Sequence, residues 1–248
     1  MSLNLSKCVC ISFYRISKPI LHDYSVRGVP LSGTSEVRDL GVFFTPSLSW
    51  ELHVQHICNS ALQVLGFLFR ASKSFTDLNV LKLLYCCLVR PHLEYNSVVW
   101  SPHQQYLKDN IEKIQRRFLR LVGVRLGFRY LDVPVQEVSR LLNLPSMESR
   151  RVSQDLLFLY KLVRGELDCP DLLERINFRV PFGTRSRALF AKTSTNTLYA
   201  ANSSLFRVQR LGNTLPDHLD LLPYPALVIQ ISCSKPPIVT RDHLWLVQ

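Results

Sequence analysis

The feature that most constrains the fold of this chain is a change in the period of its hydrophobic residues near residue 48. Upstream, Val9, Ile11 and Phe13 alternate with other residues, and a period of two is typical of a half-buried β-strand. Downstream, apolar residues recur at the spacing of a helix that buries one face. This order predicts an α+β fold that is mainly α. Short antiparallel strands and a hairpin come first, then a helical bundle, then a helical or irregular C-terminal region.

Three strand-forming segments are expected in the N-terminal part. The first spans residues 8–14. Residues 24–31 predict a hairpin in which Gly28 supplies the positive φ of a tight turn. A further strand is expected at residues 40–44, with Gly41 inside it.

Four helices are expected after the strands. Their predicted positions are 49–71, about 78–88, a stretch that begins near Asp109, and 149–164. Thr76 or Asp77 is the expected N-cap of the second helix, which Pro91 ends or kinks, and Gly165 is a natural end for the fourth. The chain has only nine glycines, which favours helices over a Gly-rich phosphate-binding fold.

The formal net charge of the chain is +11. A polyanion such as nucleic acid is a natural partner for a domain this basic, because each neutralised phosphate releases condensed counterions. Ordinary surface charge with no partner is the alternative that charge alone leaves open.

The cysteines and the N-terminus bear on the cellular compartment. The seven cysteines form no C-x-x-C pair, which favours reduced thiols over a disulfide framework. The apolar stretch 8–13 is too short for a signal-peptide core, and no apolar run could span a bilayer. We therefore expect an intracellular protein, nuclear or cytoplasmic, that is neither secreted nor bound to a membrane. His53 and His56 share a helix face, but no second pair of ligands follows at zinc spacing, so no metal site is expected.

An ordered set of short motifs resembles one protein family. The strand region contributes Leu3-Asn4-Leu5-Ser6-Lys7-Cys8 and Arg38-Asp39-Leu40-Gly41-Val42-Phe43-Phe44. The helical region continues with His53–Ile57, Leu65-Gly66-Phe67, Leu88-Val89-Arg90-Pro91, Leu93-Glu94-Tyr95, Val99-Trp100-Ser101-Pro102, Ile114-Gln115-Arg116-Arg117-Phe118, Arg150-Arg151, Asp155-Leu156 and Val180–Arg185. The set covers about residues 3 to 222 and resembles the reverse transcriptases of jockey-like non-LTR retrotransposons. Arg38 stands where that family more often has lysine.

The resemblance implies four parts. Residues 1–48 correspond to a palm remnant with strands and a hairpin like the primer grip, and residues 49–125 to the helical thumb. Residues 126–225 correspond to a C-terminal helical region, which is expected to become irregular beyond Asn177. Residues 226–248 match nothing in the family and are expected to form an irregular tail.

The polymerase chemistry of the family depends on two metal ions held by aspartates, which clamp the attacking and leaving oxygens. This sequence begins after the segments that carry those aspartates and contains no Asp-Asp dipeptide. We therefore expect a fragment of an RNA-directed DNA polymerase that is inactive alone and holds no cofactor. Mg²⁺ would be expected only with the missing palm aspartates. Lys7 is the one catalytic candidate, because it matches a lysine that acts as general acid on departing pyrophosphate. In the isolated chain we interpret Lys7 as a residue that flanks an edge strand.

The resemblance also implies weak, sequence-independent binding of an RNA or DNA primer–template duplex, and no small-molecule substrate. The expected nucleic-acid-binding residues are Lys7, Gly41, Arg70, Lys73, Arg90, Arg116, Arg117 and Arg120. Taken singly, each arginine more often belongs to a solvated helix face, and only as a cluster do they favour nucleic acid. Gly41 could equally well just pack a strand on a helix. Tyr95, Trp100 and Phe118 could stack on bases, but we expect them in the core.

Two other hypotheses stay open. The chain could belong to an active polymerase whose upstream palm is absent from this sequence, or it could be a helical interaction scaffold reused by a host. Strands at residues 8–44 that lack the rest of their sheet should leave an unpaired edge and an exposed apolar face.

Overall fold

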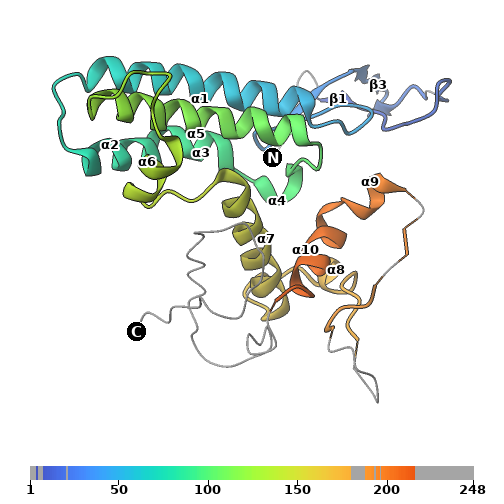
Figure 1. Ribbon diagram of the computed structural model, residues 1–248. Coiled ribbons are helices and arrows are strands. Elements are labelled where there is room, and N and C mark those ends of the chain that lie inside the picture. Colours follow the sequence, from blue (N-terminus) through green and yellow to red (C-terminus); the bar gives the residue numbers. More distant parts are fainter. Residues whose placement is uncertain are drawn as a thin grey trace.

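The computed structural model describes residues 4, 8–20, 22–179, 188–192, 194–195 and 197–215. Within them helices dominate and the strands are short, so the predicted α+β, mainly α class is confirmed (Figure 1). Lys7, the motif at Val180–Arg185 and the tail at 226–248 lie outside the described residues. In this part of the chain, no helix is long and apolar enough to cross a membrane.

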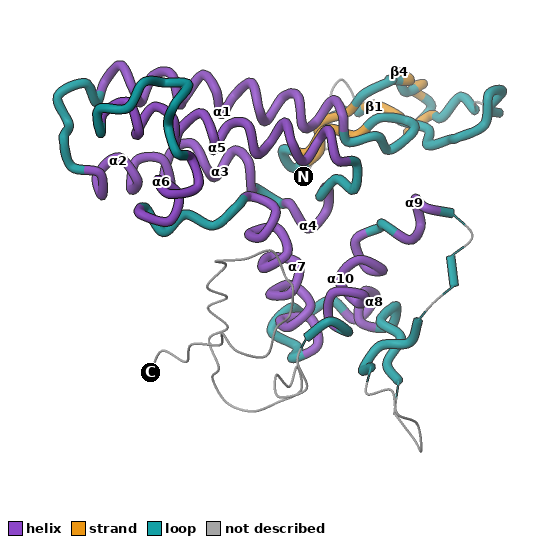
Figure 2. The backbone as a smooth tube through the Cα atoms, viewed as in Figure 1, coloured by secondary structure: helices purple, strands orange, loops and turns teal. Residues whose placement is uncertain are grey.

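The described N-terminal part contains three separate two-stranded pairs rather than one sheet (Figure 2). β1 (Val9–Cys10) pairs in parallel with β4 (Ser32–Gly33). The antiparallel pairs are β2 (Ser25–Val26) with β3 (Val29–Pro30), and β5 (Val37–Asp39) with β6 (Val42–Phe44). The strand expected at 8–14 is therefore much shorter than predicted, because only Val9 and Cys10 pair with another strand, although Tyr14 N donates a 3.0 Å hydrogen bond to Pro46 O.

Both antiparallel pairs are hairpins closed by residues with positive φ. Arg27 and Gly28 have φ of 53° and 77°, and Leu40 and Gly41 have φ of 44° and 86°. Two consecutive positive φ angles define the tight turn whose twist matches that of the flanking strands. The first turn was predicted from Gly28. The prediction that Gly41 lies inside a strand was wrong, because Leu40 and Gly41 form the turn itself and the strand begins at Val42.

The helices of the first half form one bundle around a shared apolar core. Their bounds are α1 (Glu51–Ala71), α2 (Leu78–Leu84), the π-helix η2 (Tyr85–Val89), α3 (Arg90–Glu94), α4 (Ser97–Trp100) and α5 (Gln105–Arg125). Asp77 is the N-cap of α2, and its Oδ1 accepts a hydrogen bond of 2.8 Å from Asn79 N. Pro91 does not end the helix. A π-helical turn precedes it and α3 continues to Glu94, which is one way a helix absorbs the missing N–H of proline.

The second half contains α6 (Val135–Leu141), α7 (Met147–Val163), α8 (Pro170–Leu173), α9 (Leu198–Ala201) and α10 (Ser204–Gly212). Ser146 caps α7 by accepting a 3.1 Å hydrogen bond from Ser149 N, and Gly165, with φ of 71°, follows its last turn. The expectation of irregular chain beyond Asn177 was wrong at 198–212, where α9 and α10 form. The predicted start of the third helix near Asp109 was also late, since α5 begins at Gln105.

Two apolar cores meet on α7. The first runs from Val42 to Met147 and includes buried residues of α6, so it extends past Arg125. The second packs the C-terminal half of α7 against α10 and is built from Leu159, Leu162, Ile176, Phe190 and Val208. In Figure 1, α1, α5 and α3 lie in layers, while α7 leads away from them toward α8 and α10.

Candidate nucleic-acid interface

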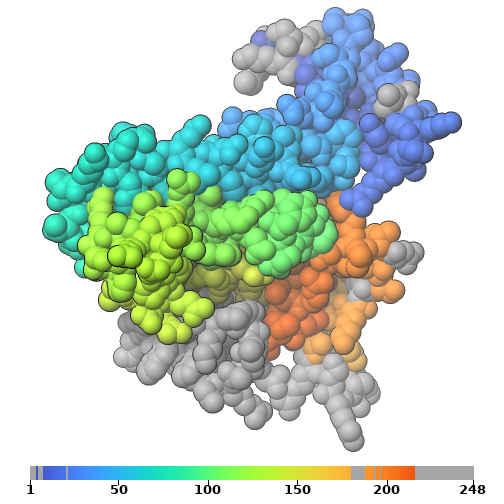
Figure 3. All heavy atoms as spheres, turned by 45° about the horizontal axis from the view of Figure 1, so that its top comes forward, coloured from blue at the N-terminus to red at the C-terminus, as the bar shows by residue number. Residues whose placement is uncertain are grey.

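A groove runs between α1 and α5, which lie side by side in Figure 3. The two helices pack through buried positions such as Ala61, Leu65, Ile111 and Phe118. Ala61 is small and fully buried, which allows the two helices to approach closely there. The groove has a volume of about 570 Å³. Its lining residues are Glu51, Val54, Gln55, Cys58, Asn59, Leu62, Tyr106, Leu107, Asn110, Lys113, Ile114 and Arg117.

The charged residues of the groove are separated along its length. Lys113 and Arg117 lie one helical turn apart on α5 and both are exposed. Lys113 Nζ donates a 3.1 Å hydrogen bond to Asn110 Oδ1, and Arg117 has no ion-pair partner among the described residues. Glu51, the acidic residue of the lining, lies at the N-terminal end of α1. The groove is therefore cationic away from the start of α1.

Arg116 and Arg120 are placed differently from Arg117. Arg116 Nη2 lies 3.9 Å from Asp109 Oδ1, so it is loosely paired. The guanidinium carbon of Arg120 lies 5.6 Å from the centroid of the Tyr130 ring, and its Nε is buried without a hydrogen-bond partner. The structure thus distinguishes three arginines that the sequence treated as one cluster, and only Arg117 lines the groove.

Arg70 and Lys73 lie at the C-terminal end of α1. Both are exposed, and neither has an ion-pair partner in the part of the chain that is described. Basic residues here also interact favourably with the negative end of the helix dipole. Arg125 ties this end of α1 to α5, since Nη2 donates to Ser72 Oγ and Nη1 to Phe75 O, each at 3.1 Å.

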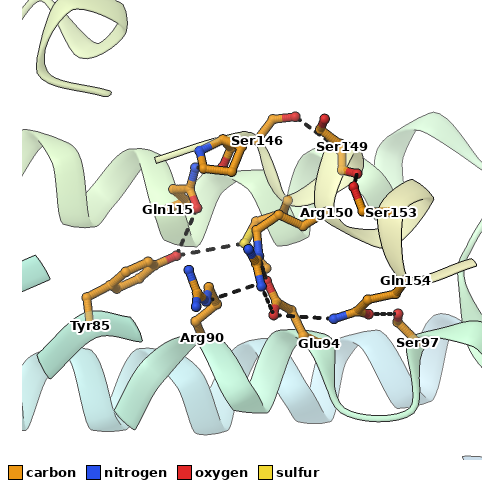
Figure 4. Close-up of polar contacts among 12 residues, drawn as sticks. Tyr85, Arg90, Glu94, Ser97, Gln115, Ser146, Ser149, Arg150, Ser153 and Gln154 are labelled. Carbon is orange, nitrogen blue, oxygen red and sulfur yellow. Dashed lines mark hydrogen bonds and ion pairs between the residues drawn. The ribbon is translucent and has the colours of Figure 1, made fainter. Parts of the chain in front are cut away.

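Arg90 belongs to an interior network rather than to the groove. Its Nε lies 3.7 Å from Glu94 Oε1, and Glu94 also accepts two hydrogen bonds from Arg150, one of them at 2.9 Å (Figure 4). Gln154 Nε2 contacts the same carboxylate at 3.4 Å and bonds to Ser97 as well. These contacts join α3 and α4 to α7. The pairing of Arg90 with Glu94 follows the i,i+4 spacing of a helix, whereas the contacts of Glu94 with Arg150 and Gln154 come from distant parts of the chain.

A second polar chain crosses the bundle interior. Tyr85 OH lies 3.2 Å from Gln115 Oε1, and Gln115 Nε2 donates a 2.8 Å hydrogen bond to Pro145 O. Burial raises the pKa of Tyr85 far above its usual range, so the phenol stays protonated and can donate. The Tyr85 ring stacks on Phe118 at 4.2 Å between centroids. Phe118 and Trp100 are buried, as expected of core residues, whereas Tyr95 is exposed.

Gly41 lies at a close contact. A Cβ at this position would come 3.1 Å from Cε1 of Tyr95, and its φ of 86° is itself strained for other residues. The contact joins the β5–β6 turn to α3, so the glycine packs a turn against a helix. Its predicted contact with nucleic acid stays a prediction.

His53 joins the strands to the bundle in a way that the sequence did not reveal. Phe43 N donates a 3.3 Å hydrogen bond to His53 Nδ1, and the imidazole meets the Trp100 ring edge-on at 4.9 Å. Burial, with a smaller contribution from His56, lowers the pKa of His53 to about 4. His56 instead stacks on Phe43 at 4.2 Å. Among the described residues, no group of three or more His, Cys, Asp or Glu side chains could hold a metal ion.

No family model matches the chain, and no solved structure matches it. Over 141 residues the chain is 27% identical to an uncharacterized protein of Caenorhabditis elegans, and the aligned stretch covers 56% of this chain and 68% of the relative. The relative's name gives no activity.

Proposed function

We propose that this chain binds nucleic-acid duplexes through the α1–α5 groove and is related to the thumb region of jockey-like non-LTR reverse transcriptases. The observation that carries the proposal is the position of Lys113 and Arg117, two exposed cations that line a groove between parallel helices. Neither cation is neutralised by a described carboxylate, so both can pair with phosphate. Such contacts give affinity without sequence preference.

Two further exposed cations, Arg70 and Lys73, lie at the C-terminal end of α1. Arg125 ties the C-terminal end of α1 to that of α5, so Arg70 and Lys73 belong to the same end of the bundle. With the net charge of +11, these unpaired cations support long-range attraction of a polyanion. We infer a duplex as the partner because the motifs that include Arg116 and Arg117 resemble a region that contacts primer and template.

In this proposal the chain does not polymerise DNA by itself. It has no Asp-Asp dipeptide, and phosphoryl transfer in this family requires carboxylates that hold two Mg²⁺ ions. The described residues therefore supply binding rather than catalysis in this proposal. A longer polypeptide that carries those carboxylates would use the same groove to position its duplex, in the nucleus or the cytoplasm.

Charge reversal in the groove tests the proposal. The whole chain and its Arg117→Glu variant are titrated with a labelled primer–template duplex at several salt concentrations. Arg117 is exposed, so the variant should fold. We expect weaker binding to every duplex sequence, and a smaller slope of log affinity against log salt by about one unit.

Lys161→Glu is the matched control, because Lys161 is exposed on α7 and makes the same change of charge away from the groove. We expect its effect to be clearly smaller than that of Arg117→Glu. Equal effects of the two variants would show that only net charge matters. Affinity that does not fall with salt would contradict phosphate binding and favour the interaction scaffold.

A further inference from the structure

The α1–α5 groove has two chemically different parts. The two helices run in the same direction, since Arg125 joins their C-terminal ends. Tyr106 lines the groove from the first turn of α5, and Lys113 and Arg117 line it two and three turns later. At 1.5 Å of rise per residue, Lys113 lies about 10 Å along the helix axis from Tyr106. The aromatic end of the groove is therefore distinct from its cationic part.

Tyr106 presents an aromatic ring that the protein itself does not use. The residue is 50% exposed. In the part of the chain that is described, no ring or cation stacks on it, and its hydroxyl makes no hydrogen bond. The floor of the groove is apolar and includes the buried residues Val54, Leu107 and Ile114. Bases of any sequence stack on exposed aromatic rings, because every base has a π-face. The ring and the floor therefore suit a nucleobase.

Glu51 makes the aromatic end unfavourable for phosphate. It lines the groove at the N-terminal end of α1, which is the same end of the bundle as Tyr106, and no cation of the described chain pairs with it. A carboxylate repels phosphate but accepts hydrogen bonds from the exocyclic amino groups of bases. The lining residues thus favour a base at Tyr106 and phosphates at Lys113 and Arg117. Inorganic phosphate would use only the two cations.

Three amide side chains line the groove between these two parts. Gln55 and Asn59 come from α1 and Asn110 from α5. Within the described chain, the side chains of Gln55 and Asn59 make no hydrogen bond, and Asn110 accepts one from Lys113 but keeps its N–H donors. An amide carries both donors and an acceptor, which is the combination that matches the edges of bases. The groove therefore offers hydrogen bonds to a base as well as a stacking surface.

The size of the groove limits which part of a nucleic acid can enter it. Its volume of about 570 Å³ is in the range of small-molecule pockets, roughly 300–1,000 Å³. A duplex is too wide, since its major groove alone measures about 12 Å across. A stacked strand advances about 3.4 Å per nucleotide, so the distance from Tyr106 to Lys113 along α5 corresponds to roughly three nucleotides. A duplex can lie on the cationic rim while an unpaired nucleotide beside it enters the groove.

We propose that the groove selects duplexes with an unpaired end over blunt duplexes. The unpaired base stacks on Tyr106 and bonds to the neighbouring amides, and phosphates farther along the nucleic acid pair with Lys113 and Arg117. This inference rests on the proposed function, because it places the duplex over those two cations. It adds the kind of nucleic-acid end that the site recognises, which the charge of the groove does not determine.

Fluorescence anisotropy titrations of the whole chain compare a labelled blunt duplex with the same duplex carrying a two-nucleotide overhang at a 3′ or a 5′ end. We expect at least one overhang duplex to bind about tenfold more tightly than the blunt duplex, as one stacked base contributes. Tyr106→Leu should lower the affinity for that overhang duplex to the affinity for the blunt one. Tyr106→Phe keeps the ring and should keep the preference.

Tyr24→Leu is the matched control, because Tyr24 is also 50% exposed but lies next to β2, outside the groove. It should keep the preference for the overhang. Arg117→Glu should weaken binding of both duplexes, since it removes a phosphate contact rather than the stacking surface. Thermal unfolding of each variant verifies that it is folded.

The outcomes separate this inference from duplex binding itself. Equal affinity of the unsubstituted chain for blunt and overhang duplexes would overturn the inference, even where Arg117→Glu supports duplex binding. A preference that survives in Tyr106→Leu would also overturn it, because the unpaired base would then bind elsewhere. Overhang binding that depends on Tyr106, in a chain that does not bind blunt duplex, would support the inference and contradict the duplex proposal. Binding of neither duplex would overturn both.

Discussion

At the scale of single residues, a charged side chain is available to bind a ligand only if no oppositely charged side chain of the protein pairs with it. Arg90 and Arg117 carry the same guanidinium, Arg90 on α3 and Arg117 on α5. Arg90 forms an ion pair with Glu94, whereas Arg117 has no carboxylate partner among the described residues. His53 differs from His56 for a similar reason, because only His53 is buried and accepts a backbone hydrogen bond.

The lowered pKa of His53 predicts a pH-dependent stability. As the pH falls below 6.5 the unfolded chain takes up a proton, while the folded chain does so only near pH 4. The stability that neutral His53 provides is therefore present above pH 6.5 and is lost between pH 6.5 and 4, by on the order of 3 kcal/mol. Urea unfolding between pH 4 and 8 measures this change.

His53→Gln supplies the control for that measurement. Its amide oxygen can still accept from Phe43 N, but it cannot titrate in this range. The difference in stability between the two proteins should grow with pH from 4 to 6.5 and then level off. A difference in stability that does not change with pH would show that protonation of His53 does not cause the loss of stability at low pH.

At the scale of elements, the contact between α5 and the following loop depends on a glycine. A Cβ at Gly123 would lie 2.3 Å from Cγ1 and 2.8 Å from Cγ2 of Val133. Val133 is buried in the first core and cannot move freely. This close approach shows why the first core continues past the end of α5, which helical periodicity alone did not indicate.

Gly123→Ala should destabilise the fold by about 1–3 kcal/mol through overpacking, although alanine favours helices. Thermal unfolding of the single variant and of Gly123→Ala with Val133→Ala measures the coupling, and the second substitution should restore part of the loss. Gly33→Ala is the comparison, since nothing lies within 4 Å of its added Cβ. Stabilisation by Gly123→Ala would mean that the loop moves aside.

At the scale of the whole molecule, the N-terminal strands leave apolar side chains in solvent. Ile20 is 96% exposed and Leu40 is 79% exposed, and the strand pairs beside them are only two strands wide. The unpaired edges and the exposed apolar face expected from the sequence are consistent with this arrangement. Such surfaces promote association of chains.

We therefore predict concentration-dependent self-association of the purified chain, which light scattering and sedimentation can measure. Ile20→Lys together with Leu40→Asn should reduce it, because both remove apolar surface and asparagine tolerates the positive φ at position 40. Leu131→Lys, at a loop residue that is 82% exposed, should have a smaller effect. A monomer at all concentrations would show that these strands need no partner.

The sequence by itself determined several of the helices and one of the two hairpins. Its periodicity located α1 and α7, Asp77 and Gly165 marked helix ends, and Gly28 marked a turn, because these signals act within a few neighbouring residues. Only the tertiary structure decided which cations stay free and which cavities form. Glu94 meets Arg150, and Arg15 meets Tyr199, across long stretches of chain. Contacts between residues so far apart leave no trace in local spacing. The difference between Arg117 and its neighbours Arg116 and Arg120, and a second cavity beside Arg15, therefore emerged only from the packed molecule.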